Sequence, residues 1–212
     1  MSQLHPPIAA RLGDVTTVRL SLRRFRPDDL EELTAVFAHA EVWQFPYGRA
    51  LTHAESEAFL DAQITHWQDC GFGCWTARER DTSRLVGYVG LSVPTFLPEI
   101  LPAVEVGWRF MPTAWGKGYA TEGAAAALDE AFTTLGLNTV CSLPQADNPR
   151  SGKVAERLGM RQIREVKVAA DERRGAVTAV LYEIDAGNWL SARRAERARS
   201  SLPIVRHRRG SL

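Results

Sequence analysis

Residues 115–122 read Trp-Gly-Lys-Gly-Tyr-Ala-Thr-Glu and lead directly into the alanine-rich stretch 123–132. Small residues recur at Gly116, Gly118 and Ala120, and the stretch that follows has a helical composition. Small side chains at the start of a helix leave the backbone N–H groups accessible, and the helix dipole adds positive potential there. The segment therefore predicts a binding site for a phosphate or pyrophosphate group.

Two well-known phosphate-binding motifs do not fit this stretch. A Walker loop needs Ser or Thr after its lysine, whereas Lys117 is followed by Gly118. A Rossmann turn needs a third glycine, where this chain has Thr121, and it must follow its strand directly. Here residues 111–115 separate the predicted strand 104–110 from Gly116. A third class of phosphate-binding turn is needed.

The stretch resembles the coenzyme A loop of the GNAT N-acetyltransferases, Q/R-x-x-G-x-G/A, with Trp115 in the first place. The RimJ/RimL-like branch of that family, the ribosomal-protein N-terminal acetyltransferases, commonly has W-G-K-G-Y-A-T-E, which residues 115–122 match throughout. A second segment, 148–160, is similar to that branch's N-x-x-S-x-r-v-x-e-k-l-G-f, with Gly152 and Met160 as departures. Taken singly, each segment also fits a tight turn or a capped helix. Their occurrence in the right order favours the family.

The periodicity of the chain predicts an α/β (α+β) fold. We expect strands at 17–23, 72–80, 85–93, 103–110, 139–143, 160–169 and 176–184, and helices beginning near Pro27, Thr52, Gly123 and Asn148. This order implies a mixed, mostly antiparallel sheet flanked by helices, which is the element order of the GNAT fold. We expect a loose N-terminal leader at 1–15, the acetyltransferase domain at 16–186 and a basic C-terminal tail at 187–212.

Composition narrows the classes of function and partner. The chain has 212 residues, of which 45% are hydrophobic, enough for one domain with a substantial core. Its net charge is +1, but arginines crowd the C-terminal stretch 193–209, so the body is mildly acidic and suits an amine substrate. We expect the tail to be poorly ordered, and it has no interleaved aromatics, which argues against nucleic-acid binding.

The cysteines and the hydropathy of the chain predict its compartment. Cys70, Cys74 and Cys141 are an odd number, and Cys70 and Cys74 lack a second ligand pair, so we expect reduced thiols and no metal site. Residues 2–11 do not form a secretory signal, and no apolar run reaches membrane-spanning length. The predicted protein is cytoplasmic, with no membrane partner, and a homodimer is left open.

Acetyl transfer to an amine needs a base, because an exposed amine is mostly protonated at neutral pH. Glu105 is the candidate: it lies on the strand before the loop, and alternation places it on one face with Gly107 and Arg109. Several GNAT enzymes carry a base Glu at this position. The alternative is a salt bridge between Glu105 and Arg109.

The resemblance also implies residues for the leaving group and for acetyl-coenzyme A. Many GNAT enzymes use a Tyr to protonate the thiolate, but that position is Ala155 here. The RimJ/RimL-like branch offers a Ser, matched by Ser151, while Asn148 is expected to bond the pantetheine arm; either could instead only cap its helix. Lys117, Arg150 and Lys153 are candidates for the outer phosphates. The implied cofactor-binding set is Phe110, Met111, Trp115, Gly116, Lys117, Gly118, Tyr119, Ala120, Thr121, Asn148 and Ser151.

The acceptor of the acetyl group is left open by the sequence. Trp43, Phe45 and Tyr47 lie in the connection where GNAT enzymes build the acceptor wall, although core packing is the commoner role of each. The acceptor could be a protein α-amine or a small-molecule amine such as a polyamine or aminoglycoside. Two other classes compete with the enzyme: an acyl-coenzyme A sensing module, favoured by the missing Tyr, and a nucleic-acid-associated protein that uses the tail.

Overall fold

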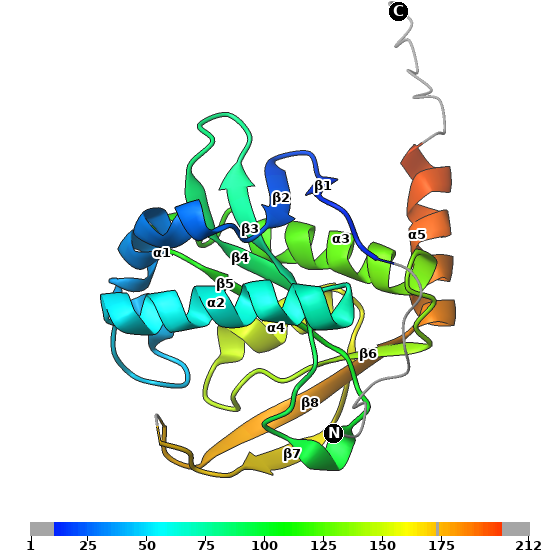
Figure 1. Ribbon diagram of the computed structural model, residues 1–212. Coiled ribbons are helices and arrows are strands. Elements are labelled where there is room, and N and C mark those ends of the chain that lie inside the picture. Colours follow the sequence, from blue (N-terminus) through cyan, green and yellow to red (C-terminus); the bar gives the residue numbers. More distant parts are fainter. Residues whose placement is uncertain (1–10, 173, 201–212) are drawn as a thin grey trace, which may run out of the picture.

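An eight-stranded sheet forms the centre of the molecule (Figure 1). The computed structural model describes residues 11–172 and 174–200. The strand order is β1-β2-β3-β4-β5-β6-β8-β7, and every neighbouring pair is antiparallel except β5 and β6. The strands are β1 (Val15–Thr16), β2 (Leu20–Arg24), β3 (Cys74–Glu79), β4 (Leu85–Ser92), β5 (Glu105–Phe110), β6 (Thr139–Ser142), β7 (Arg161–Val168) and β8 (Val177–Asp185). The predicted mixed, mostly antiparallel sheet is confirmed.

Five α-helices accompany the sheet in the described part of the chain. They are α1 (Leu30–Phe37), α2 (His53–Cys70), α3 (Tyr119–Thr133), α4 (Pro149–Arg157) and α5 (Ala186–Ser200). The core under α1 and α2 gathers Leu33, Phe37 and Leu60 with the buried turn residue Trp43. A second, larger cluster packs the alanines of α3 and the apolar side of α4 against β4, β5 and β8. Met111, which directly follows β5, packs against both clusters.

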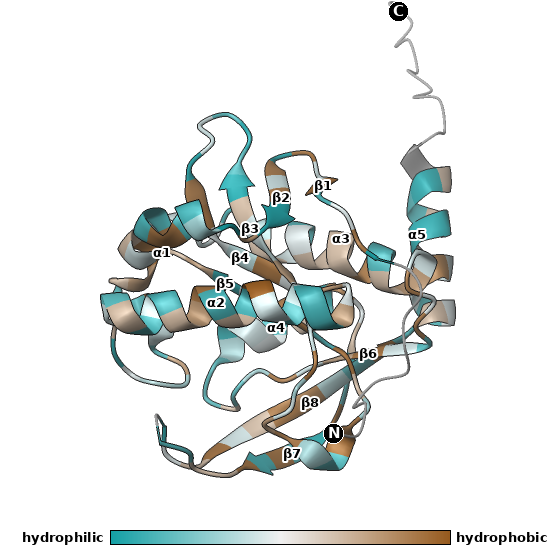
Figure 2. Ribbon diagram, viewed as in Figure 1, coloured by the Kyte–Doolittle hydropathy of each residue, from teal (hydrophilic) through white to brown (hydrophobic). Residues whose placement is uncertain are grey.

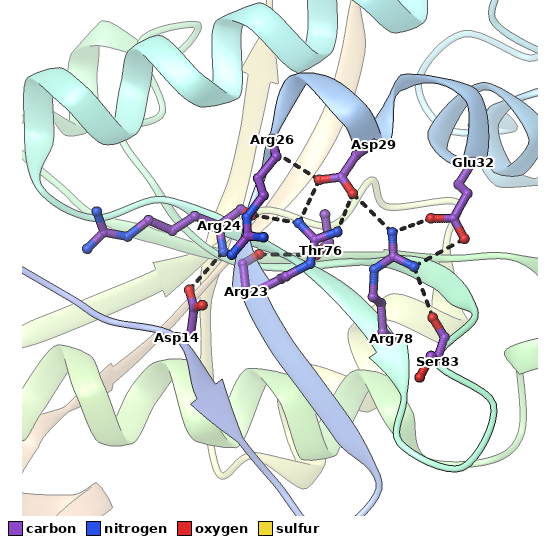
Figure 3. A network of polar contacts seen from close by, with 9 residues as sticks. All are labelled: Asp14, Arg23, Arg24, Arg26, Asp29, Glu32, Thr76, Arg78 and Ser83. Atoms are coloured by element: carbon purple, nitrogen blue, oxygen red, sulfur yellow. Dashed lines mark hydrogen bonds and ion pairs between the residues drawn. The ribbon is translucent and has the colours of Figure 1, made fainter.

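A buried acidic residue fastens α1 to the sheet (Figure 3). Asp29 is only 1% exposed, and its carboxylate accepts hydrogen bonds from Arg23 Nη1 at 2.8 Å, Arg78 Nη2 at 3.0 Å and the Arg26 amide at 2.8 Å. Burial alone would raise the pKa of Asp29, but these donors outweigh it and the pKa is lowered. The charged Asp29 therefore fixes the start of α1 and, through α1, the segment that carries Trp43.

The C-terminal region differs from the predicted loose tail. Residues 186–200 form α5, where Trp189 is buried and donates from Nε1 to Asp129 on α3 at 2.9 Å. Arg193 also donates from Nε to Asp129, at 3.1 Å. This part of the expected tail is docked because one aromatic and one carboxylate hold it; its later turns are mainly hydrophilic (Figure 2). Residues 201–212, which complete the tail, lie outside the described residues.

The N-terminal expectations need two corrections. Leu12 falls in the predicted leader, yet it is 1% exposed and its amide bonds to Gly71 O at 3.0 Å; residues 1–10 lie outside the described residues. The predicted strand 17–23 begins later, at Leu20, because residues 17–19 make the turn between β1 and β2. Val18 is at that turn and is 82% exposed. A turn breaks the alternation that would otherwise bury it.

Candidate active site

The segment 115–122 turns the chain from β5 into α3. Gly116 and Gly118 have φ values of +74° and +81°, a left-handed conformation that costs other residues about 1–2 kcal/mol. Gly118 is the N-cap of α3, and it has no side chain with which to cap the first turn. Among the described residues, no acceptor is bonded to the backbone N–H groups of residues 116–121. The predicted anion site is therefore a row of unpaired donors at the positive end of a 15-residue helix.

Glu122 holds this helix end in place. Its carboxylate accepts hydrogen bonds from Thr17 Oγ1 at 2.6 Å and from the Arg19 amide at 2.7 Å, and it pairs with the Arg19 guanidinium at 2.6 Å. Arg19 also donates to Lys117 O at 2.7 Å. Hydrogen bonds from the turn between β1 and β2 thus hold the loop and the start of α3 in place. Glu122 is structural, and these contacts could not be predicted from the sequence because the bonded residues are about a hundred positions apart.

Two residues of the loop point toward β3 rather than toward the unpaired amides. Lys117 Nζ forms an ion pair with Glu79 at 3.2 Å, and the Tyr119 hydroxyl donates to the same carboxylate at 3.1 Å. Lys117 therefore has a carboxylate partner, so binding a phosphate would require it to exchange that partner.

The second sequence segment lies next to the first. The Arg150 guanidinium stacks over the Trp115 ring at 5.1 Å, which joins the start of α4 to the loop. Asn148 is the N-cap of α4, and its Oδ1 accepts from the Ser151 amide at 3.3 Å. The Ser151 hydroxyl and the Asn148 amide nitrogen have no hydrogen-bond partner among the described residues. Both therefore remain able to bond a ligand while Asn148 Oδ1 caps the helix.

The departure from the family pattern at Gly152 has a steric reason. A Cβ at this position would lie 3.3 Å from the hydroxyl of Tyr182 on β8. Ala155, where many GNAT enzymes have Tyr, is completely buried in the larger core cluster, so a larger side chain there would have to displace its neighbours. Lys153 is exposed on the same helix, and no contact of its side chain fixes it near the loop.

Strands β5 and β6 separate near the loop 115–122 and the start of α4. β5 and β6 are parallel, and they are paired only at Glu105 and Cys141, with the Cys141 amide bonded to Val104 O at 2.9 Å. Beyond Glu105 the two strands have no further partner positions. At the far end of β5, Phe110 O accepts from Trp115 Nε1 at 2.7 Å and the Met111 amide donates to Val86 O at 2.9 Å. Because a carbonyl accepts two bonds, Phe110 O can still pair with an added strand, whereas the Met111 N–H is already used.

Glu105 sits at the point where β5 and β6 part. Burial raises its pKa to about 7, and a backbone hydrogen bond from Leu143 offsets part of that rise. Arg109 does not pair with it, so the predicted alternative of a salt bridge is wrong. The neighbouring thiols of Cys74 and Cys141 also have raised pKa values, because they are buried and lie near the Glu105 charge. A carboxylate without a cation, with a pKa near neutrality, has the properties of a general base.

Of the three aromatic residues expected to line the acceptor site, one is buried in the core and two are partly exposed. Trp43 is 5% exposed and packs edge-on against Phe37 with ring centroids 5.0 Å apart, so it belongs to the core. Tyr47 stacks on Trp43 at 5.3 Å and, like Phe45, is only partly buried. The guanidinium of Arg109 lies 3.8 Å over the Trp43 ring. Arg109 is not among the predicted site residues, yet it contacts this connection; its place on the same face of the strand as Glu105 was the available signal.

The described part of the chain contains neither a group of metal-binding side chains nor a helix that could span a membrane. No group of three or more His, Cys, Asp or Glu side chains there could hold a metal ion. Within residues 11–172 and 174–200, no helix is long and apolar enough to cross a bilayer.

Comparison with known proteins agrees with this geometry. The chain is 26% identical to YoaA, an uncharacterized N-acetyltransferase of Bacillus subtilis, over 69% of this chain and 81% of that protein. Its fold is similar to a GNAT-family acetyltransferase of Bacillus anthracis, with a TM-score of 0.68, 22% identity and 82% and 99% of the two chains covered. It is also similar to a ribosomal-protein-S5-alanine acetyltransferase of Vibrio fischeri, with a TM-score of 0.65, 17% identity and 83% and 98% covered. The family model of the acetyltransferase (GNAT) domain matches residues 19–161. The chain therefore belongs to the GNAT family of N-acetyltransferases.

Proposed function

We propose that the protein transfers the acetyl group of acetyl-coenzyme A to a primary amine by direct attack in a ternary complex. The observation that carries this proposal is the position of Glu105. It lies where β5 and β6 part, it has no cationic partner, and the unpaired amides of residues 116–121 follow the same strand. In this proposal the base lies on β5, and the helix end that binds the anion follows in the turn after that strand.

The loop fits the pyrophosphate of coenzyme A. Its unpaired N–H groups and its two left-handed glycines provide donors without side chains in front of them. Asn148 would bond the pantetheine arm through its free amide nitrogen. Arg150 would face the outer phosphates, and Lys117 would reach them only by exchanging its Glu79 partner. Acetyl-coenzyme A supplies the activated thioester.

Two residues of the chain would assist the transfer, one at the acceptor amine and one at the departing sulfur. Glu105 takes a proton from the acceptor ammonium, directly or through water, so that the neutral amine can attack. Ser151 donates a hydrogen bond to the departing sulfur, which Ala155 cannot do. The acetyl C–S bond breaks as the C–N bond forms, the attacking nitrogen loses its surplus proton, the departing thiolate gains one to leave as free thiol, and no covalent enzyme intermediate is needed.

An acceptor screen tests the proposal. Candidate peptides with free α-amines, polyamines and aminoglycosides are incubated with acetyl-coenzyme A while free thiol is measured and the acceptor is analysed by mass spectrometry. We expect an acetylated acceptor and an equal amount of thiol, both strongly reduced in Glu105→Gln. Tight acetyl-coenzyme A binding with no transfer to any class of amine would instead support a sensing module, which the absence of Tyr at position 155 favours.

A further inference from the structure

Arg109 on β5 forms hydrogen bonds to the segment 42–47, which contains Trp43, Phe45 and Tyr47. Its Nη1 donates to Phe45 O at 2.7 Å and also to Val42 O, and its Nε donates to the Tyr88 hydroxyl at 3.1 Å. Its guanidinium lies on the ring of Trp43. The side chain is thus held in one position by partners from β4 and from residues 42–45.

None of these partners carries a negative charge. Among the ion pairs of the described residues, none includes Arg109. The Glu105 carboxylate, on the same face of β5, owes its pKa to burial and to Leu143 rather than to Arg109. Tyr88, which accepts from Arg109, has a raised pKa because of its burial and is a neutral phenol at pH 7. The guanidinium is therefore a fixed, partly buried charge without a counter-ion.

Two donors among the described residues of this cluster are left without an acceptor. Nη2 of Arg109 has no bonded acceptor among the described residues, and the Trp43 Nε1 atom is buried without a partner. An unpaired, partly buried cation is costly, and a carboxylate restores the balance through short, charge-assisted hydrogen bonds. The arrangement is complementary to an anion and unfavourable for a polycation.

We propose that Arg109 binds a carboxylate of the acceptor, and that the acceptor is a peptide or protein N-terminus with Asp or Glu at its second or third residue. This inference rests on the proposed acetyl transfer, because it places the acceptor amine beside Glu105. The Cα atoms of residues 105 and 109 are roughly 13 Å apart at the rise of a strand. Because the two side chains leave the same face of the strand at separate positions, an acceptor with its amine and carboxylate several bonds apart fits them better than a free α-amino acid, whose two groups are separated by one carbon.

The test compares matched acceptors with matched variants. Amidated peptides Ala-Glu-Ala-Ala, Ala-Ala-Glu-Ala and their Gln counterparts, together with free glutamate and spermidine, are titrated by calorimetry into the protein with coenzyme A bound. The same compounds are then assayed for thiol release with acetyl-coenzyme A. We expect at least one Glu peptide to bind about 10- to 100-fold more tightly than its Gln counterpart, as for charge-assisted hydrogen bonds.

Three variants test whether the preference for Glu peptides depends on the charge of Arg109. Arg109→Gln is expected to reduce the Glu/Gln preference to within about twofold, and Arg109→Lys to retain part of it, because only the charge is kept. Arg49→Gln is the control: Arg49 lies in the same connection but is paired with Glu55, and the preference is expected to persist.

Several results would overturn the inference. These are equal affinity of the wild type for Glu and Gln peptides, no binding of either while coenzyme A still binds, or tighter binding of spermidine or free glutamate. A preference that survives in Arg109→Gln would also overturn it. Selective binding of a Glu peptide without any thiol release would uphold the Arg109 site and contradict the proposed acetyl transfer.

Discussion

Replacing Glu105 by Gln should stabilise the protein above pH 7 and leave its stability unchanged below pH 4.5. The folded-state pKa of Glu105 is raised from 4.5 to about 7, so the folded protein keeps a proton that the unfolded chain releases. The stability contributed by the protonated carboxyl is complete below pH 4.5 and is lost as the pH rises to 7. Gln stays neutral throughout and can still accept the Leu143 bond.

The structure sets the size of the effect. A shift from 4.5 to about 7 corresponds to a ceiling of about 3 kcal/mol, at 1.36 kcal/mol per pKa unit. Glu105 is only partly buried, so solvent screening reduces the expected gain to about 1–3 kcal/mol.

Urea unfolding of both proteins, followed by tryptophan fluorescence over this pH range, measures the difference. Glu165→Gln on β7 is the control, because Glu165 is exposed and its replacement should change stability by less than about 0.5 kcal/mol at every pH. A difference between Glu105→Gln and wild type that does not grow with pH would refute the raised pKa and, with it, the electrostatic reasoning.

Three further substitutions test the cofactor-binding residues. Gly118→Asp puts a carboxylate and a Cβ, 3.3 Å from Arg19 Nη2, into a left-handed position; it should abolish the thermal shift produced by acetyl-coenzyme A, and an unchanged shift in the folded variant would exclude the loop as its site. Ser151→Ala should lower kcat with little change in the KM of acetyl-coenzyme A, and a change in KM alone would make Ser151 a binding residue. Asn148→Ala should raise that KM and cost about 0.5–2 kcal/mol of stability in a denaturation curve, because Asn148 caps α4; an unchanged KM would reduce it to a cap.

Local signals in the sequence located most of the fold. The Thr52 and Glu55 side chains indicate a helix start, and α2 begins at His53 with both capping hydrogen bonds formed. Alternation correctly placed Leu20 and Leu22 in the core, and it failed at Val18 because a turn between two short paired segments has the same composition as a strand end.

Features that depend on distant contacts could not be predicted in the same way. The point at which β5 and β6 separate depends on the register of the sheet, and no residue type in either strand predicts it. The docking of α5 depends on Asp129, which is far from Trp189 in the chain. The face of β5 was predictable, but the loop carbonyls that hold Arg109 were not, because carbonyl positions carry no sequence signal.

The pH dependence of kcat/KM for an amine acceptor, measured in the wild type and in Glu105→Gln, tests the central claim most directly. Glu105 must be ionised to accept a proton, so the wild-type rate should rise through about pH 7 and then level, apart from the titration of the acceptor itself. In Glu105→Gln that inflection should vanish and the rate near neutrality should fall by roughly 10²–10⁴-fold. A variant with the wild-type rate and the same inflection would show that Glu105 is not the base.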